Sequence, residues 1–424
     1  MGDLNNDMLG GPALEGDVAS VGAFNDSLIG GNNGLVGDAL GAGNDSLTGG
    51  TGNATSGGGL DEFNDRLTGT PGADTLTGDI VIGGTGTALF SFTNPGNSTA
   101  HAFNDTVNGA AGNDAITGDV AMPGLGSHNV AVTVADNGNG HLDLFNDTLV
   151  GGAGDDTIVG DFSLAGGHID ITVNGGSGDD TMFCDLIKGG AGNDLLIGDF
   201  QDNGDVTLTL SGDTSGFKLF ADTINGGAGD DTILGGLGDD VLNGDDGNDS
   251  IDGGVGNDIL SGGGGHDILI GGAGDDSLSG GGGDDTLIGG IGNDQLEGGS
   301  GHDVFQFSLH DSETNGGGPG ANDGADHIVD WNSATDILKF TDVVDQHSGS
   351  NSPADLLDDL AQSVAGIHDD GANTTITFKN GASVQFDGIH GVVANANAVA
   401  PADIGQDLQD LVKGQTAHLE IAHG

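Results

Sequence analysis

Residues 226–306 read GGAGDDTIL, GGLGDDVLN, GDDGNDSID, GGVGNDILS, GGGGHDILI, GGAGDDSLS, GGGGDDTLI, GGIGNDQLE and GGSGHDVFQ, which are nine nonapeptides without a gap. Every copy has Asp at its sixth position and an apolar residue at its eighth. The sixth-position residues are Asp231, Asp240, Asp249, Asp258, Asp267, Asp276, Asp285, Asp294 and Asp303. The eighth-position residues are Ile233, Leu242, Ile251, Leu260, Leu269, Leu278, Leu287, Leu296 and Phe305. A flexible Gly-rich linker has no such fixed apolar column, so the stretch is predicted to be an ordered repeat.

The chemistry of the repeat predicts a very thin β-structure. Gly allows positive φ and close backbone approach, so the Gly-rich half of each nonapeptide suits a tight turn. The other half suits a very short strand with the apolar residue on one face. Two nonapeptides then make one flattened coil, whose apolar residues point inward between two opposed sheets. Because no single repeat buries its apolar residue alone, successive coils must stack.

The Asp residues fall alternately on the two edges of such a coil. One edge stacks Asp231, Asp249, Asp267, Asp285 and Asp303, and the other stacks Asp240, Asp258, Asp276 and Asp294. Carboxylates stacked one coil apart repel each other, and a divalent cation between them converts the repulsion into attraction. Carboxylate and turn carbonyl oxygens suit the flexible coordination of Ca²⁺ better than the small octahedron of Mg²⁺. His266 and His302, at fifth positions, are interpreted as solvated turn residues rather than ligands.

These nonapeptides resemble the repeat of the RTX (hemolysin-type) family, G-G-x-G-x-D-x-U-x with U apolar. The resemblance implies an all-β fold, a parallel β-roll or β-solenoid with insert strands and a small C-terminal α+β cap. It implies Ca²⁺ as the cofactor, with about seven ions in 226–306 if one ion lies between each stacked Asp pair as in the family. It also implies a secreted or extracellular protein, including one held at the cell surface, that leaves the cell through the type I secretion machinery.

The amino-terminal half repeats with a longer period. A Phe-x-Asp motif recurs with its Asp residues 37 to 42 residues apart, and in five copies a second Asp follows nine residues later. Each copy therefore contains two nonapeptide-like units and an insert, and its Asp residues are predicted as further metal ligands. These upstream candidates are Asp65, Asp74, Asp105, Asp114, Asp147, Asp156, Asp185, Asp194 and Asp222.

Each insert begins with Gly-Asp, at 78–79, 118–119, 160–161 and 198–199, and then alternates apolar and polar residues. A period of two predicts half-buried strands over Asn129–Val134, His168–Val173 and Asp205–Leu210. The Gly, Asn and Asp turns after them indicate either hairpins or lengthened coils.

After Gln306 the repeat stops, and residues 326–331 and 336–340 resemble segments that close many RTX arrays. A helix is predicted over Pro353–Val364 and a hairpin over Thr374–Phe386, around Asn380-Gly381. Trp331 is predicted to be a core residue of this cap, which covers the open end of the solenoid. The mildly amphipathic tail 406–424 is a candidate export signal. The predicted regions are 1–225 with the long repeats and inserts, 226–306 with the regular roll, and 307–424 with the cap and secretion signal.

Composition excludes several classes of protein. The chain has 66 acidic and 6 basic residues among 424, and its net charge is -60. It therefore lacks the Lys and Arg clusters that bind nucleic acid or anionic membranes. The single Cys rules out an intramolecular disulfide framework. No apolar stretch approaches the length of a membrane-spanning helix, and the amino terminus has no Sec-type signal pattern.

No catalytic motif stands apart from the repeats. The sequence has no H-E-x-x-H, G-x-S-x-G or GxxxxGK[ST] pattern, and the stretch before residue 226 holds no repeat-free segment long enough for a separate catalytic domain. The predicted function is therefore a calcium-binding RTX solenoid that folds on binding Ca²⁺ and has a structural or surface-interaction role. One alternative is an adhesin or carbohydrate-binding exoprotein that uses the insert strands. Another is an enzyme with a site on an insert face, as in epimerase-like solenoids.

Overall fold

A computed structural model places most of the repeats in parallel β-sheets. It describes residues 8–9, 27–29, 35–36, 46–48, 61–62, 66–68, 75–77, 80–81, 87–94, 99–102, 106–111, 113–118, 120–122, 128–136, 141–144, 146–164, 167–175, 181–182, 184–201, 205–212, 218–308, 324–332, 334–343, 359–379, 381–389, 397–398 and 419–423. The chain divides into an amino-terminal unit, Met1–Val241, and a carboxy-terminal unit, Leu242–Gly424. The all-β, parallel roll predicted from the repeats is confirmed in both.

Two sheets form the roll of the amino-terminal unit, and their strands alternate along the chain. The first sheet contains, in spatial order, β1 (Met8–Leu9), β2 (Ser27–Ile29), β4 (Ser46–Thr48), β7 (Thr75–Thr77), β12 (Ala115–Thr117), β17 (Thr157–Val159), β22 (Leu195–Ile197) and β27 (Thr232–Leu237). The second contains β3 (Leu35–Val36), β6 (Arg66–Thr68), β11 (Thr106–Ala111), β16 (Thr148–Ala153), β21 (Leu186–Ala191) and β26 (Thr223–Ala228). All these neighbours pair in parallel.

The inserts add three further parallel sheets to this unit. One contains β8 (Ile80–Val81), β13 (Val120–Met122), β18 (Phe162–Leu164) and β23 (Phe200–Gln201). The next contains β9 (Thr87–Asn94), β14 (His128–Asp136), β19 (Gly167–Gly175) and β24 (Asp205–Gly212). The third contains β5 (Asp61–Glu62), β10 (Thr99–Ala102), β15 (His141–Leu144), β20 (Thr181–Met182) and β25 (Lys218–Leu219).

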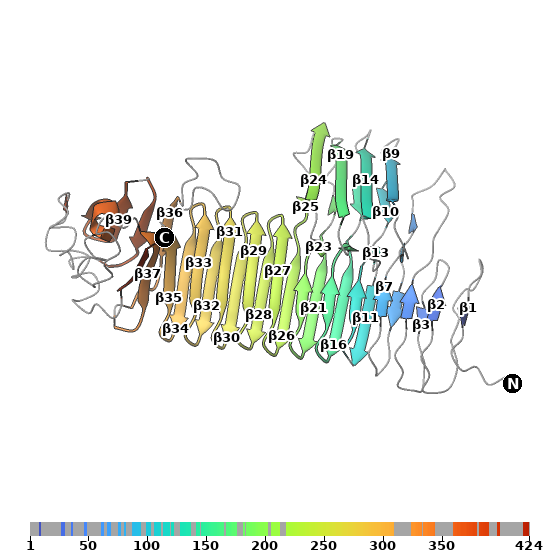
Figure 1. Ribbon diagram of the computed structural model, residues 1–424, viewed down its shortest axis with the longest axis horizontal. Coiled ribbons are helices and arrows are strands. Elements are labelled where there is room, and N and C mark those ends of the chain that lie inside the picture. Colours follow the sequence, from blue (N-terminus) through green and yellow to red (C-terminus); the bar gives the residue numbers. More distant parts are fainter. Residues whose placement is uncertain are drawn as a thin grey trace. The chain divides into compact units, whose positions relative to one another are not determined.

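Each insert therefore lengthens its coil. The three predicted insert strands lie within β14, β19 and β24, which run side by side (Figure 1). β19 pairs in parallel with both β14 and β24, so equivalent residues of successive inserts stack in register. Of the two structures that the sequence left open, lengthened coils are the one observed.

The carboxy-terminal unit contains the regular array. One sheet has, in order, β29 (Ser250–Val255), β31 (Ile268–Ala273), β33 (Thr286–Ile291), β35 (Val304–Ser308), β37 (Ile337–Val343) and β42 (Leu419–His423). The other has β28 (Val241–Asp246), β30 (Ile259–Gly264), β32 (Ser277–Gly282), β34 (Gln295–Ser300), β36 (Ala325–Ile328), β40 (Ser383–Phe386), β39 (Thr374–Phe378), β38 (Val364–Asp369) and β41 (Asn397–Ala398). Ile251 pairs with Leu269, which pairs with Leu287, so one coil is two nonapeptides.

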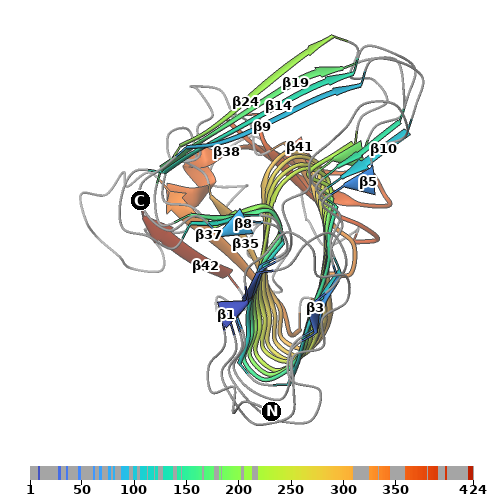
Figure 2. The ribbon, with the colours of Figure 1, turned by 90° about the vertical axis from the view of Figure 1, so that its right-hand side faces the viewer.

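The eighth-position residues form the core that the repeat predicts. Ile233, Leu242, Ile251, Leu260, Leu269, Leu278, Leu287, Leu296 and Phe305 are all at most 1% exposed. Burying a Leu or Ile side chain stabilises a fold by about 1.5–3 kcal/mol. The eighth-position residue is therefore the main apolar contribution of each repeat to the stability of the roll. Within the carboxy-terminal unit, Figure 2 shows the strands of successive coils one behind another.

The array ends in a small cap. β38, β39 and β40 pair in antiparallel fashion, which confirms the predicted hairpin over 374–386. Residues 359–363 are helical and β38 begins at Val364, while the first part of the predicted helix lies outside the described residues. Trp331 is 5% exposed, with its ring centroid 6.0 Å from that of Phe305 and 5.6 Å from that of Phe386. It is the core residue that the sequence predicted.

The turns depend on Gly at defined positions. The second and fourth residues of a nonapeptide have positive φ, as at Gly272 (φ 109°) and Gly274 (φ 144°), a conformation that L-residues rarely adopt. Asp245 is the exception at a second position, with φ 73°. Asp tolerates the left-handed region better than most residues, and Gly247 still provides the fourth position.

The first position of the nonapeptide requires Gly because there is no room for a Cβ atom there. A Cβ at Gly262 would overlap Oδ2 of Asp267 and would lie 2.7 Å from the carbonyl O of Gly280, one coil further on. A Cβ at Gly264, two residues later in the same turn, would meet nothing closer than 3.8 Å.

These two glycines give a matched test of the turn. We expect Gly262→Ala to lower the free energy of unfolding by about 1–3 kcal/mol, the usual cost of overpacking. Gly264→Ala is expected to leave it unchanged or raise it by up to about 1 kcal/mol, because Ala reduces the entropy of the unfolded chain. Urea unfolding of the calcium-saturated chain measures both, and equal effects would contradict the assigned contacts.

Candidate calcium-binding turns

The sixth-position Asp residues form two hydrogen-bonded columns in the carboxy-terminal unit. On one edge, Oδ1 of each Asp accepts the backbone N–H of the Asp one coil earlier. The N···O distances are 2.8 Å for Asp249 to Asp267, 2.9 Å for Asp267 to Asp285 and 3.0 Å for Asp285 to Asp303. On the other edge they are 2.8 Å for Asp258 to Asp276 and 2.9 Å for Asp276 to Asp294. The structure thus brings the predicted residues of each edge together at a spacing of one coil.

The second column has a further member that sequence reasoning missed. Asp294 donates its backbone N–H to Oδ1 of Asp326 at 3.1 Å. Asp326 is 3% exposed, and it lies beyond the last nonapeptide. A signal was present, because Asp326 and Ile328 repeat the spacing of the sixth and eighth positions, and Ile328 pairs with Leu296.

The upstream candidates form equivalent columns in the amino-terminal unit. Asp114, Asp156, Asp194 and Asp231 follow one another with N···Oδ1 distances of 2.7–2.8 Å. Asp147, Asp185, Asp222 and Asp240 do the same on the other edge, at 2.7–2.8 Å. Inserts of about twenty residues therefore leave the stacking of the Asp residues intact. Asp65, Asp74 and Asp105 lie outside the described residues.

The second carboxylate oxygen of the column Asp residues is buried. In Asp156, Asp185, Asp194, Asp222, Asp267, Asp276, Asp285 and Asp294, Oδ2 accepts no hydrogen bond within the described part of the chain. Each of these Oδ2 atoms lies against the Cα of a first-position Gly, as Asp267 does at Gly262 and Asp276 does at Gly271. At seven of these turns, all except that of Asp294, the carbonyl O of the Gly one coil further on lies beside the Oδ2 atom. Each of these seven turns thus presents a carboxylate oxygen and a carbonyl oxygen on the same side.

This donor set fits a hard divalent cation. Among the described residues, no three Asp, Glu, His or Cys side chains come together as a metal cage, so backbone oxygens must complete any coordination sphere. Ca²⁺ accepts such mixed carboxylate and carbonyl ligands, whereas Zn²⁺ prefers thiolate and imidazole. The Asp side chains can therefore contribute their buried Oδ2 atoms as ligands to a calcium site. The carbonyl oxygens of the turn glycines can provide the other ligands.

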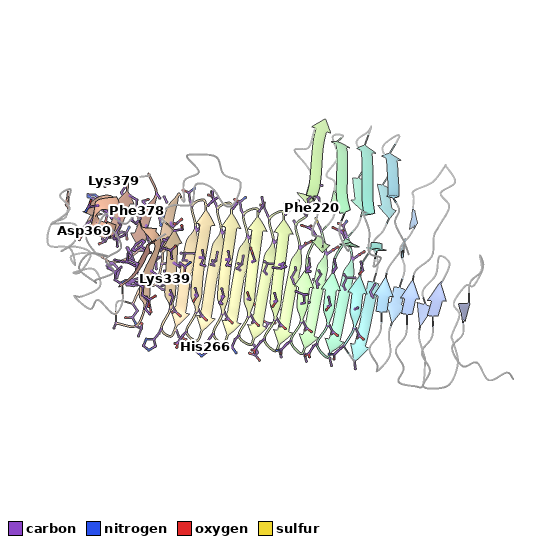
Figure 3. The ribbon with its side chains drawn as sticks, viewed as in Figure 1. Phe220, His266, Lys339, Asp369, Phe378 and Lys379 are labelled. Carbon is purple, nitrogen blue, oxygen red and sulfur yellow. The ribbon has the colours of Figure 1, made fainter. Side chains whose placement is uncertain are left out.

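The fifth-position residues form a separate, exposed ladder. Nδ1 of His266 accepts the backbone N–H of Asp284 at 2.8 Å, and Oδ1 of Asp284 accepts that of His302 at 2.9 Å. Figure 3 shows His266 at the turn edge. Both His residues are exposed, as predicted for solvated turn residues. His266 thus satisfies a turn amide, as Asn248 and Asn257 do in their turns, whereas Nδ1 of His302 lies 3.2 Å from the carbonyl O of Thr335.

Burial makes the column carboxyls hard to ionise. It raises the pKa of Asp285 and Asp294 to about 6 and that of Asp276 to about 7, against the opposing effect of the N–H bond to Oδ1. In the amino-terminal unit, burial raises the pKa of Asp194 to about 6 and that of Asp185 to about 8. A buried carboxylate must be neutralised by a proton or by a cation.

Stacked parallel coils with a buried Asp at every turn define a calcium-binding β-roll. The family model of the RTX calcium-binding nonapeptide repeat matches residues 40–55, 61–87, 99–120, 143–162, 172–183, 185–204, 219–251, 234–269, 243–278 and 270–305. The chain is therefore an RTX calcium-binding repeat protein, a class whose members are typically secreted. No curated protein is significantly similar to the chain. Within the described residues, no helix has the length and apolar character to cross a bilayer.

Without calcium, we expect the free energy of unfolding to fall as the pH rises from about 5 to about 8. The folded chain holds protons with pKa values of about 6 to 8, whereas Asp in the unfolded chain has a pKa of about 3.9. The stabilisation is complete below about pH 4 and is lost as the pH rises through the folded-state values. Urea unfolding in a chelator, followed by circular dichroism, measures the trend. A stability that stays constant or increases with pH in this range would contradict it.

Proposed function

We propose that the protein is a secreted calcium-binding solenoid that folds when it reaches calcium and then has a structural or surface-interaction role. The observation that carries the proposal is the series of eight buried Asp Oδ2 atoms, from Asp156 to Asp294, that accept no hydrogen bond within the described part of the chain, seven of them beside Gly carbonyls. The predicted sixth-position and upstream Asp residues are its ligands, with about seven ions in the regular array. No motif or described site favours an enzyme, so we propose a non-catalytic role.

The energetics support folding outside the cell. Extracellular calcium modules bind with Kd of about 10⁻⁴ to 10⁻³ M. At about ten times Kd, each independent site adds roughly 1.4 kcal/mol to stability. Seven such sites contribute on the order of 10 kcal/mol, which equals the stability of a typical domain. At calcium concentrations far below Kd this contribution disappears, so the chain would stay open for export through the type I secretion machinery.

One observation favours a second candidate, an adhesin or carbohydrate-binding exoprotein. The parallel register places Ser91, Thr133, Thr172 and Thr209 in one row across the insert sheet β9, β14, β19 and β24. The register thus repeats a hydroxyl residue type on four successive strands, which is the sequence pattern that this candidate would use. Binding of the calcium-loaded chain to immobilised glycans would favour this candidate.

The direct test is calcium-dependent folding. We expect the full chain to be largely unstructured in a chelator at neutral pH and to gain β-structure on addition of about millimolar calcium. Far-ultraviolet circular dichroism measures the transition, and magnesium at the same concentration is the control. The same folded spectrum in chelator and in calcium would overturn the proposal for the array.

The columns predict where a lost carboxylate matters most. Asp267 bonds to Asp249 on one side and to Asp285 on the other, whereas Asp303 is the last nonapeptide Asp of this edge. We expect Asp267→Ala to raise the calcium midpoint more than Asp303→Ala and to lower the cooperativity, because it separates two shorter stacks. Asp267→Asn should be milder, since its carbonyl oxygen still accepts the Asp249 N–H. Calcium titrations of the full-length variants decide this, and equal midpoints for the two Ala variants would show that ions do not bridge successive coils.

A further inference from the structure

The insert-bearing coils differ from the regular array at one residue of the turn. In the array, the residue after the first Gly is usually another Gly with positive φ, which turns the chain back. After Gly160 and Gly198 the residue is Asp161 or Asp199, and neither has a positive φ. The chain therefore continues outward into β18 and β23. We call residues 160–161 and 198–199 the exit turns.

The exit-turn Asp residues are buried, and three of their four carboxylate oxygens accept no hydrogen bond among the described residues. Asp161 is 1% exposed, and neither of its carboxylate oxygens has a partner among the described residues. Asp199 is 2% exposed, and its Oδ1 has none, while its Oδ2 accepts the backbone N–H of Leu237 at 2.7 Å. The two turns stack, because Asp161 donates its backbone N–H to the carbonyl O of Asp199 at 3.1 Å. Leaving two oxygens of one buried carboxylate without donors is costly unless another group neutralises it.

Each exit turn also meets an Asp of the column where the insert returns. Oδ2 of Asp185 lies against the Cα of Gly160, where a Cβ would overlap both it and the carbonyl O of Gly198. In the next coil, a Cβ at Gly198 would overlap Oδ2 of Asp222 and the carbonyl O of Gly235. Among the described residues, these two Oδ2 atoms also accept no hydrogen bond. The regular array has one buried Asp at each such turn, and the exit turns have two.

In the part of the chain that the structure describes, no side chain neutralises the extra carboxyl group. Burial, followed by the charges of Asp185, Asp199, Asp222 and Asp147, raises the pKa of Asp161 well above its ordinary value. Within the described residues of this unit no salt bridge reaches these groups, and Lys188 is exposed on β21.

The preceding coils have no Lys at the position equivalent to Lys218. Its register partner in the preceding coil is Thr181, whose own partner is Asp143. A Lys side chain therefore cannot be a repeated counter-charge for the exit turns. The exit-turn carboxylates can then be neutralised by protons or by a bound cation. The carboxylate and carbonyl oxygens that converge there are all hard ligands.

We propose that the exit turns bind calcium through Asp161 and Asp199, in addition to the nonapeptide carboxylates. One site contains Asp161, Asp185 and the carbonyl O of Gly198. The other contains Asp199, Asp222 and the carbonyl O of Gly235. The inference rests on the proposed calcium binding of the turns and extends it to residues outside the nonapeptide pattern. Because Phe162 and Phe200 follow directly as the first residues of β18 and β23, calcium here fixes the start of each insert.

The test is the number of calcium ions bound by full-length variants. We expect Asp161→Ala to bind one ion fewer than the unmodified chain in equilibrium dialysis with elemental analysis, and its insert strands to be cleaved faster by protease in calcium. Asp161→Asn should bind with an intermediate affinity. Asp230→Ala is the matched control, because Asp230 is exposed in the neighbouring turn and its register equivalent is Asn193. It should match the unmodified chain in both measurements.

A second variant separates failure of this inference from failure of the proposed function. Asp267→Ala removes a nonapeptide carboxylate and should also lose bound calcium. If Asp267→Ala loses calcium and Asp161→Ala does not, the exit turns hold protons and the inference is overturned. If neither variant loses calcium, the proposed function itself fails. If Asp161→Ala does not fold in calcium, the calcium titration of Asp161→Asn decides, because Asn keeps the side-chain volume. A weakened or lost ion supports the inference, and an ion count and affinity equal to those of the unmodified chain overturn it.

Discussion

The hydrogen bond from the backbone N–H of one turn Asp to Oδ1 of the Asp in the next coil is the interaction on which the roll depends. It satisfies a buried amide at every turn, which a Gly-rich turn has few other ways to do. It also fixes the carboxyl group, so that Oδ2 faces a Gly Cα and a carbonyl oxygen. The two oxygens of one side chain thus have separate roles, one in the fold and one available to a cation.

Because of this arrangement, the stability of the fold depends on neutralisation of the buried carboxyl groups. The apolar column contributes one Leu, Ile or Phe per repeat, while each repeat also buries a carboxyl group. Burial of the apolar side chain stabilises the coil. This stabilisation must also offset the free-energy cost of removing the Asp carboxyl group from water. Neutralisation by protons or by calcium therefore decides whether the coil is stable, and a net charge of -60 adds repulsion over longer distances.

The inserts show how far this geometry tolerates change. An insert enters at only one of the two turns of a coil, and its strands pair in parallel with those of the coils before and after it. The column is therefore uninterrupted from Asp147 through Asp185 to Asp222, although these residues are 38 and 37 residues apart. The same entry point replaces a turn Gly by Asp161 or Asp199, which concentrates acid where the chain leaves the roll.

The sequence by itself determined the parallel roll, its apolar column and the Asp residues that share an edge, because a strict period fixes which residues repeat on each coil. It also determined the cap hairpin and the burial of Trp331. The period ends at Gln306, so Asp326 entered the second column only through tertiary structure, which carries the chain back to the same edge. Hairpins and lengthened coils were equally compatible with the insert pattern, since both alternate in the same way, and only the parallel pairing of neighbouring coils decided between them. Asp161 and Asp199 were visible as the start of each insert. That their oxygens are buried beside Asp185 and Asp222 was decided by the stacking of the next coil, because a residue's burial depends on neighbours that its own repeat does not contain.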